Sequence, residues 1–225
     1  MCIFLDDADY RQFVYLLGDV LEGFSIRCWN YCVMPNHYHA TVEPTQRNLS
    51  EAIRQVNGVY AQWWNRRHGR VGHVFQGRFK DQIVDREGYL LVLSRYVPMN
   101  PVRAGLVKLP EDWMWSSYRA TLGLSPVPAF LDVSSTLRLF GDGEESGLRP
   151  HFSRFVCEKD NDLTAVDRIR SEERILGSRK FKDYVLSWVG VRSGDSCPSQ
   201  DPLPSSTGTP GKTVAGCGDF NSSQA

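Results

Sequence analysis

The feature that most constrains this chain is a pair of strand-like segments separated by a short turn. Residues 25–33 and 37–43 alternate in side-chain character, and Pro35 and Asn36 lie between them. A period of two residues is typical of strands, and proline and asparagine favour turns. We therefore predict a β-hairpin whose second strand carries His37 and His39.

The two histidines share one face of the predicted strand, because successive side chains point to opposite sides. Neutral imidazole is a common metal ligand, so His37 and His39 are candidates for binding one ion. Two ligands do not complete a site, and a third would come from elsewhere in the chain. A His-x-His pair also arises by chance, so the pair alone does not establish a metal site.

Helical patterns flank this hairpin. Apolar residues recur at helical spacing in residues 7–23, with Asp6 or Asp7 as the cap, and in residues 49–67. Between the second helix and a third one capped by Asp85, residues 74–79 and 82–84 are expected to be strands. Beyond residue 124 we expect short helices.

The third helix carries a stripe of residues at offsets of four, three and four: Tyr89, Leu93, Tyr96 and Asn100. Periodicity alone favours Tyr96 as one more core aromatic on this stripe. Pro98 lacks an amide donor and is expected to kink the helix or end it early. Asn100 would then lie on a distorted turn.

Charge is unevenly distributed although the formal net charge of the 225 residues is zero. From Ala52 to Lys80 the chain has no acidic residue, and its basic residues there are Arg54, Arg66, Arg67, Arg70, Arg78 and Lys80. Arg66 and Arg67 could simply complement the dipole at the end of their helix. The alternative is a surface that binds the phosphates of nucleic acid.

Composition limits the class of protein. With 41% hydrophobic residues the chain can bury a full core. No apolar run approaches the ~20 residues of a membrane span, and the first residues do not have the pattern of a signal peptide. The six cysteines lack paired spacing. We expect a cytoplasmic protein with a main domain in residues 1–123, a helical extension in residues 124–190 and a disordered tail, rich in Ser, Gly and Pro, in residues 191–225.

Several separated segments resemble one known family. They are Met34-Pro35-Asn36-His37-Tyr38-His39, Gly72 to Arg78, Ser94-Arg95-Tyr96-Val97, Asn100 to Val107 and Trp113 to Tyr118. This set is similar to the IS200-like and REP-associated tyrosine transposases, whose HUH motif is histidine, hydrophobe, histidine. The similarity extends from about Ile3 to Gly123.

The resemblance implies an α+β fold with a ferredoxin-like antiparallel sheet flanked by helices. It implies that Tyr96 is the nucleophile and that His37, His39 and Asn100 bind Mg²⁺ or Mn²⁺. The expected partner is single-stranded or hairpin DNA, cut through a 5′-phosphotyrosine intermediate by a monomer or homodimer without membrane association. The residues expected to contact DNA are Arg66, Arg67, Arg70, Arg78, Lys80 and Arg103.

Two departures from the family pattern leave alternatives open. The family begins with a β-strand that has no counterpart before Ile3, which would leave a gap at the centre of the sheet. Pro98 also interrupts the catalytic helix. These departures favour a relative that binds DNA without cutting it, whereas the complete set of His37, His39, Tyr96 and Asn100 favours an enzyme. A metal-dependent hydrolase of small phosphate compounds would explain the histidines but not the basic aromatic segments.

Overall fold

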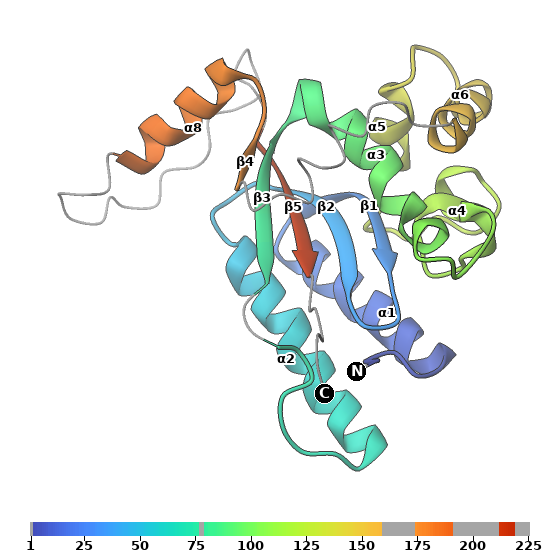
Figure 1. Ribbon diagram of the computed structural model, residues 1–225, viewed down its shortest axis with the longest axis vertical. Helices are drawn as coiled ribbons and strands as arrows, with labels where there is room; N and C mark the ends of the chain where they lie inside the picture. The colour runs from blue at the N-terminus through green and yellow to red at the C-terminus, as the bar shows by residue number, and fades with distance from the viewer. Residues whose placement is uncertain (1, 77–78, 159–173, 191–211, 219–225) are drawn as a thin grey trace.

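A five-stranded sheet forms the centre of the protein, which we describe from a computed structural model covering residues 2–76, 79–158, 174–190 and 212–218. The strand order is β1-β2-β5-β3-β4 (Figure 1). The strands are β1 Ile26–Val33, β2 Tyr38–Pro44, β3 Lys80–Asp85, β4 Ile175–Leu176 and β5 Lys212–Gly218. All neighbouring strands are antiparallel except β3 and the two-residue β4. The predicted α+β class with a ferredoxin-like sheet is confirmed.

The predicted hairpin is confirmed. Strands β1 and β2 pair with Cys32 opposite His39 and Val33 opposite Tyr38. The amide of Met34 donates to the carbonyl of His37 at 2.8 Å, which closes the two-residue turn. His37 lies directly before β2 and His39 lies within it.

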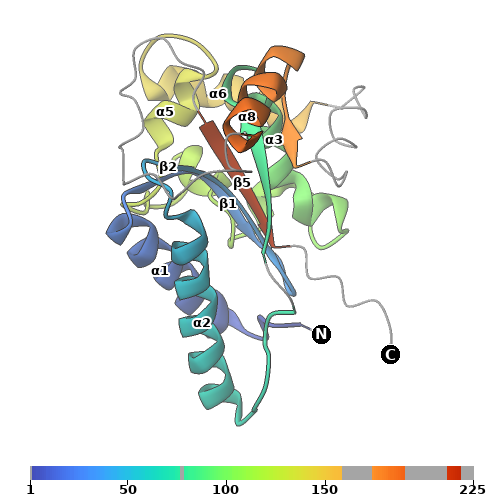
Figure 2. The ribbon, with the colours of Figure 1, turned by 90° about the vertical axis from the view of Figure 1, so that its left-hand side faces the viewer.

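Two helices cover one face of the sheet (Figure 2). Helix α1 (Asp7–Gly23) begins at Asp6, whose carboxylate accepts hydrogen bonds from the amides of Ala8 and Asp9. Helix α2 (Leu49–His68) ends at Gly69, which adopts a left-handed φ of 61° that glycine tolerates without strain. The apolar sides of both helices pack with Tyr38, Ala40 and Val42 in the main core. These three residues thus face away from the histidines, as the alternation predicted.

Helix α3 (Arg86–Arg103) packs on the opposite face and does not end early at Pro98. The helix continues through Pro98 and Pro101 to Arg103. Pro101 has no amide to donate to the carbonyl of Val97, four residues earlier. The side-chain amide of Asn100 donates to that carbonyl at 3.2 Å and to the carbonyl of Tyr96 at 2.9 Å. Burial of Leu93, Tyr96 and Val97 against the sheet also holds this part of the helix.

The centre of the sheet differs from expectation. We expected a gap there and a disordered tail from residue 191. Instead β5 lies between β2 and β3 and pairs with both (Figure 1). Val42 of β2 and Ile83 of β3 are both opposite Val214. Each of these two strands therefore has a hydrogen-bonding neighbour at the position where a gap would have exposed its backbone. The rest of the tail lies outside the described residues.

The remaining elements are short. They are η1 Pro110–Asp112, α4 Tyr118–Thr121, α5 Val133–Arg138, α6 Glu145–Cys157 and α8 Arg179–Gly190. Leu131 forms a bridge to Cys28, so the segment before α5 covers the outer edge of β1. The strand predicted at residues 74–79 is wrong, because residues 74–76 and 79 are irregular and residues 77–78 lie outside the described part. None of the helices described is both long and apolar enough to cross a membrane.

Candidate active site

His37 and His39 converge at the end of the hairpin. Their Nε2 atoms are 3.0 Å apart, and their rings are perpendicular. The carbonyl of Pro35 accepts hydrogen bonds from the amides of Ile3 and Phe4, which fixes the turn to the segment before α1. His39 is only 3% exposed. The predicted shared face of the two histidines is therefore confirmed.

The spacing of the two nitrogen atoms fits a shared metal ion. Two ligands bound at ~2.1 Å and at right angles in an octahedral site are separated by about 3.0 Å. Within the described residues, no group of three or more His, Cys, Asp and Glu side chains is arranged to bind a metal. An ion bound by His37 and His39 would therefore complete its shell with neutral oxygen ligands, water or a phosphate. The oxygen ligands of such a shell would suit Mg²⁺ or Mn²⁺, whereas imidazole also suits Zn²⁺, Fe²⁺ or Ni²⁺.

Tyr96 lies against this histidine pair. Its ring centroid is 5.7 Å from that of His39, with an edge-to-face angle of 83°. The ring belongs to a small cluster between α3 and the sheet that includes Cys32, Met34 and Leu93. Tyr96 is 6% exposed, so it is both a packed aromatic residue and a neighbour of the candidate metal ligand. The two interpretations of the sequence are compatible in the fold.

Other tyrosines use their hydroxyl groups to hold the structure. Tyr60 donates to the carbonyl of Ile3 at 2.8 Å, and Tyr118 donates to Ser153 at 3.4 Å. Burial is the main cause that raises the pKa of both phenols well above the usual range, which disfavours their phenolate forms. Neither group is suited to act as a nucleophile.

Asn100 and Arg103 follow Tyr96 on the same helix, one and two turns later. The amide nitrogen of Asn100 is directed to the carbonyls of its own helix, as described above. The guanidinium carbon of Arg103 lies 5.3 Å from the centre of the Tyr96 ring. The structure thus brings His37, His39, Tyr96 and Arg103 together, while the side-chain amide of Asn100 donates to carbonyls of its own helix.

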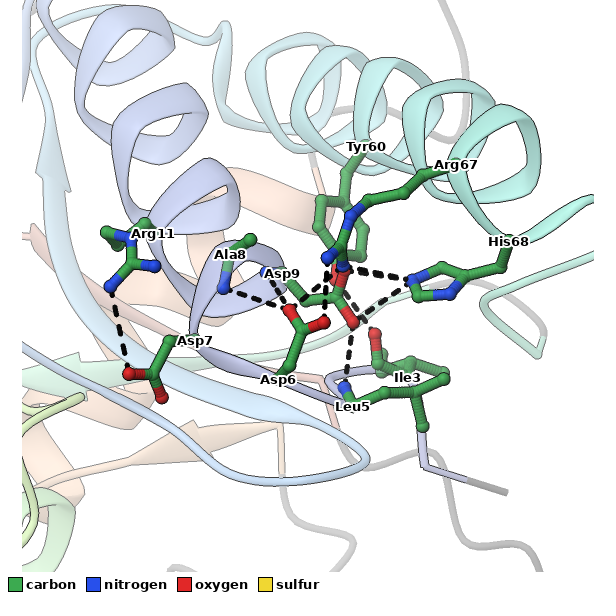
Figure 3. A network of polar contacts seen from close by, with 10 residues as sticks. All are labelled: Ile3, Leu5, Asp6, Asp7, Ala8, Asp9, Arg11, Tyr60, Arg67 and His68. Atoms are coloured by element: carbon green, nitrogen blue, oxygen red, sulfur yellow. Dashed lines mark hydrogen bonds and ion pairs between the residues drawn. The ribbon is translucent and has the colours of Figure 1, made fainter.

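The residues predicted to contact DNA fall into different environments. Arg66, Arg70 and Lys80 are exposed, and Arg70 lies 5.7 Å from the centre of the Trp64 ring. Arg78 lies outside the described residues. Arg67 is held inside a network of polar contacts that joins the end of α2 to the start of α1 (Figure 3).

In that network Arg67 binds both oxygen atoms of Asp6, at 2.7 and 2.9 Å, and also pairs with Asp9. Asp9 is completely buried and accepts hydrogen bonds from the amide of Leu5 and from His68. The Arg67 hydrogen bonds are the main cause that lowers the pKa of Asp6 to about 2. The structural role of Arg67 was not predicted from the sequence. Arg67 and its two aspartate partners are about sixty residues apart, and no local pattern links them.

Asn36 had no predicted role, and Arg103 was predicted to contact DNA without its place over the Tyr96 ring. Asn36 contacts the ring of His37 at 2.7 Å, and Arg103 lies over Tyr96. Signals for both were present. Asn36 directly precedes His37, and Arg103 follows Tyr96 by seven residues, which is about two helical turns.

Comparison with known proteins agrees with this geometry. The family described as "Transposase IS200 like" matches residues 3–100, a range that contains His37, His39, Tyr96 and Asn100. A curated Haemophilus influenzae protein, named as a REP-associated tyrosine transposase, is 22% identical over 158 residues, covering 62% of this chain and 90% of that protein. No solved structure matches. Through its residues 3–100, which bring the histidine pair and Tyr96 together, this chain is similar to the IS200-like transposases.

Proposed function

We propose that this protein cuts and rejoins single-stranded or hairpin DNA with Tyr96 as the nucleophile. The observation that carries this proposal is the contact between Tyr96 and His39 across the interface of α3 and the sheet. A tyrosine on a helix and two histidines on a strand are thereby brought to one point. The match to a transposase family supports DNA as the partner.

In the proposed reaction the Tyr96 oxygen attacks the phosphorus of a phosphodiester. The bond from phosphorus to the 3′-oxygen breaks, and that oxygen takes the electron pair and a proton. The tyrosine gives up its own proton to solvent and becomes linked to the 5′-phosphate. Attack by a 3′-hydroxyl on this linkage reverses the step and joins strands, so neither an oxidant nor an external energy source is needed.

His37, His39 and Asn100 are the proposed metal ligands. Turning the side chain of Asn100 away from its helix carbonyls would be needed for its oxygen to reach such a site. A bound Mg²⁺ or Mn²⁺ would polarise the phosphate oxygens. The chain itself contributes orientation, because the packed cluster around Tyr96 restricts its ring and the hairpin turn restricts His37.

Exposed basic residues are proposed to hold the DNA backbone. Arg66, Arg70 and Lys80 present positive charge from the end of α2 and the start of β3. Arg103 adds a positive charge next to Tyr96. A guanidinium group can form two hydrogen bonds to a phosphate, which suits it to fix a backbone near the nucleophile.

The second candidate function is DNA binding without cleavage. The burial of Tyr96 at 6% exposure and the engagement of Asn100 with its own helix favour it. Cleavage would require DNA to reach the Tyr96 oxygen, whereas binding alone would not.

A covalent-trapping experiment separates these two functions. The protein is incubated in Mn²⁺ with hairpin DNA that is labelled on both the 5′ and the 3′ side of the possible cleavage positions. The mixture is then denatured. The proposal requires an adduct in which the 5′-phosphate is linked to Tyr96, and its loss in Tyr96→Phe, which keeps the ring and its packing. Tyr89→Phe on the same helix is the matched control and retains the adduct. DNA binding without any adduct in the parent would support the second function.

A further inference from the structure

The side chain of Asn36 contacts one of the two ring nitrogen atoms of His37. Its Oδ1 atom lies 2.7 Å from His37 Nδ1. An amide oxygen only accepts hydrogen bonds, so the imidazole must donate from Nδ1. A neutral imidazole carries a single N–H, and its Nε2 atom therefore presents a lone pair.

The second ring nitrogen of His37 points at His39. Since His37 Nε2 carries the lone pair, the 3.0 Å contact between the two Nε2 atoms requires His39 to donate its own Nε2–H. The two histidines are then unequal before a metal arrives.

We propose that Asn36 is a positioning residue that selects the Nδ1–H tautomer of His37 and aims its Nε2 atom at the metal site. This inference rests on the function proposed above, and it assigns a role that the sequence motif did not. Hydrogen bonds of this kind fix the tautomer and ring orientation of a ligand and raise its basicity. The turn that carries Asn36 is itself held by the hydrogen bonds to Pro35, so the amide is kept beside the ring.

The first test reads the tautomer directly, without a metal. Nitrogen-15 NMR at a pH where the histidines are neutral distinguishes a protonated ring nitrogen from one with a lone pair. The parent is expected to show a proton on Nδ1 of His37 and a lone pair on Nε2. Asn36→Ala should shift His37 toward the Nε2–H form, while Asn36→Asp should keep the parent's tautomer because its carboxylate also accepts.

The second test measures Mn²⁺ affinity by calorimetry. Asn36→Ala should weaken binding by about 10- to 100-fold, the usual effect of removing such a partner, and Asn36→Asp should restore it. Asn36 has no positive φ, so alanine can adopt its backbone conformation. Asn57→Ala is the matched control. Asn57 accepts a hydrogen bond from Tyr38, which lies between the histidines but faces the other side of the sheet.

The outcomes separate this inference from the proposed function. An unchanged His37 tautomer in folded Asn36→Ala overturns the role of Asn36, as does an equal effect of Asn57→Ala on Mn²⁺ affinity. If the parent binds no Mn²⁺, or if binding survives His37→Ala with His39→Ala, the metal assignment fails. The tautomer comparison still decides in that case whether Asn36 sets the state of His37.

Discussion

The guanidinium carbon of Arg103 lies 5.3 Å from the centre of the Tyr96 ring, two turns earlier on the same helix. This contact pairs a permanent positive charge with the proposed nucleophile. Tyr96 is buried against the sheet, whereas Arg103 is exposed at the end of the helix. Arg103 is therefore positioned to meet a phosphate group that approaches Tyr96 from solvent.

Arg103→Ala is expected to slow formation of the Tyr96 adduct by about 10-fold or more, because an oriented cation near the phosphoryl oxygens stabilises charge in the transition state. Single-turnover rates with trapped adduct measure this effect. Arg95→Ala is the control. Arg95 is also on α3, its guanidinium carbon lies 5.8 Å from the centre of the Phe155 ring of α6, and it has no assigned role in the reaction. Equal rates for Arg103→Ala and Arg95→Ala would exclude Arg103 from the chemistry.

Arg66→Ala and Arg70→Ala are each expected to weaken DNA binding at all sequences. Each change removes about one phosphate contact, so the slope of log affinity against log salt should fall in magnitude by about one. Fluorescence anisotropy over a range of salt concentrations measures the slope. Arg54 is exposed at the other end of α2, near Glu51, and Arg54→Ala should leave the slope unchanged. Parent-like slopes for the other two variants would contradict a DNA-binding surface here.

Arg67→Ala is expected to act on stability rather than on DNA. The change removes the Arg67 partner of Asp9, whose side chain is fully buried, and leaves a carboxylate that Leu5 and His68 contact among the described residues. The midpoint of urea unfolding should fall, while the salt dependence of DNA binding stays as in the parent. Arg66→Ala should reduce the salt dependence of DNA binding and change the free energy of unfolding by less than about 0.5 kcal/mol. If Arg67→Ala instead lowers the salt dependence of DNA binding, Arg67 contacts DNA.

The lowered pKa of Asp6 leads to a prediction for how the free energy of unfolding depends on pH. Hydrogen bonds from Arg67 are the main cause that holds its pKa at about 2, below the usual value of ~3.9. The folded state thus favours the charged carboxylate, and the resulting stability is present above about pH 4 and is lost as pH falls toward 2. Asp6→Asn keeps a helix-capping residue but removes the titration. Urea unfolding at pH 5 and pH 2.5 should show a smaller loss of stability in this variant than in the parent.

Much of the local structure could be predicted from the sequence, because it depends on neighbours in the chain. The hairpin followed from alternation around Pro35 and Asn36, and α1 and α2 followed from periodicity and capping. The shared face of His37 and His39 followed from strand geometry alone. The proximity of Tyr96 to His39 depends on how α3 packs against the sheet, and only the family resemblance implied it.

Other features depend on contacts between distant residues. The buried Asp9 gains its partner Arg67 from the end of α2, a contact that no local pattern indicates. The helix continued through Pro98 and Pro101 because it packs against the sheet and because the side chain of Asn100 donates to the Val97 carbonyl, which Pro101 leaves without an amide donor. Strand β5 comes from a tail rich in Ser, Gly and Pro, with Gly216 and Gly218 in the strand itself. Glycine lowers strand propensity, so nothing local predicted a strand there.

The position of β5 leads to the last prediction, that residues 212–218 stabilise the strand that carries His39. His39 of β2 and Lys80 of β3 are both opposite Cys217, so removing residues 212–225 would leave one edge of each neighbouring strand without a backbone partner. Amide hydrogens of β2 that face β5 should then exchange with solvent at least about tenfold faster in this truncation. The affinity of the protein for Mn²⁺ should fall in the same truncation. Removal of residues 219–225 alone leaves β5 intact and is the control. If the two truncations exchange hydrogen at the same rates across β2, the sheet does not depend on β5 and the histidine pair is supported by the β1–β2 hairpin alone.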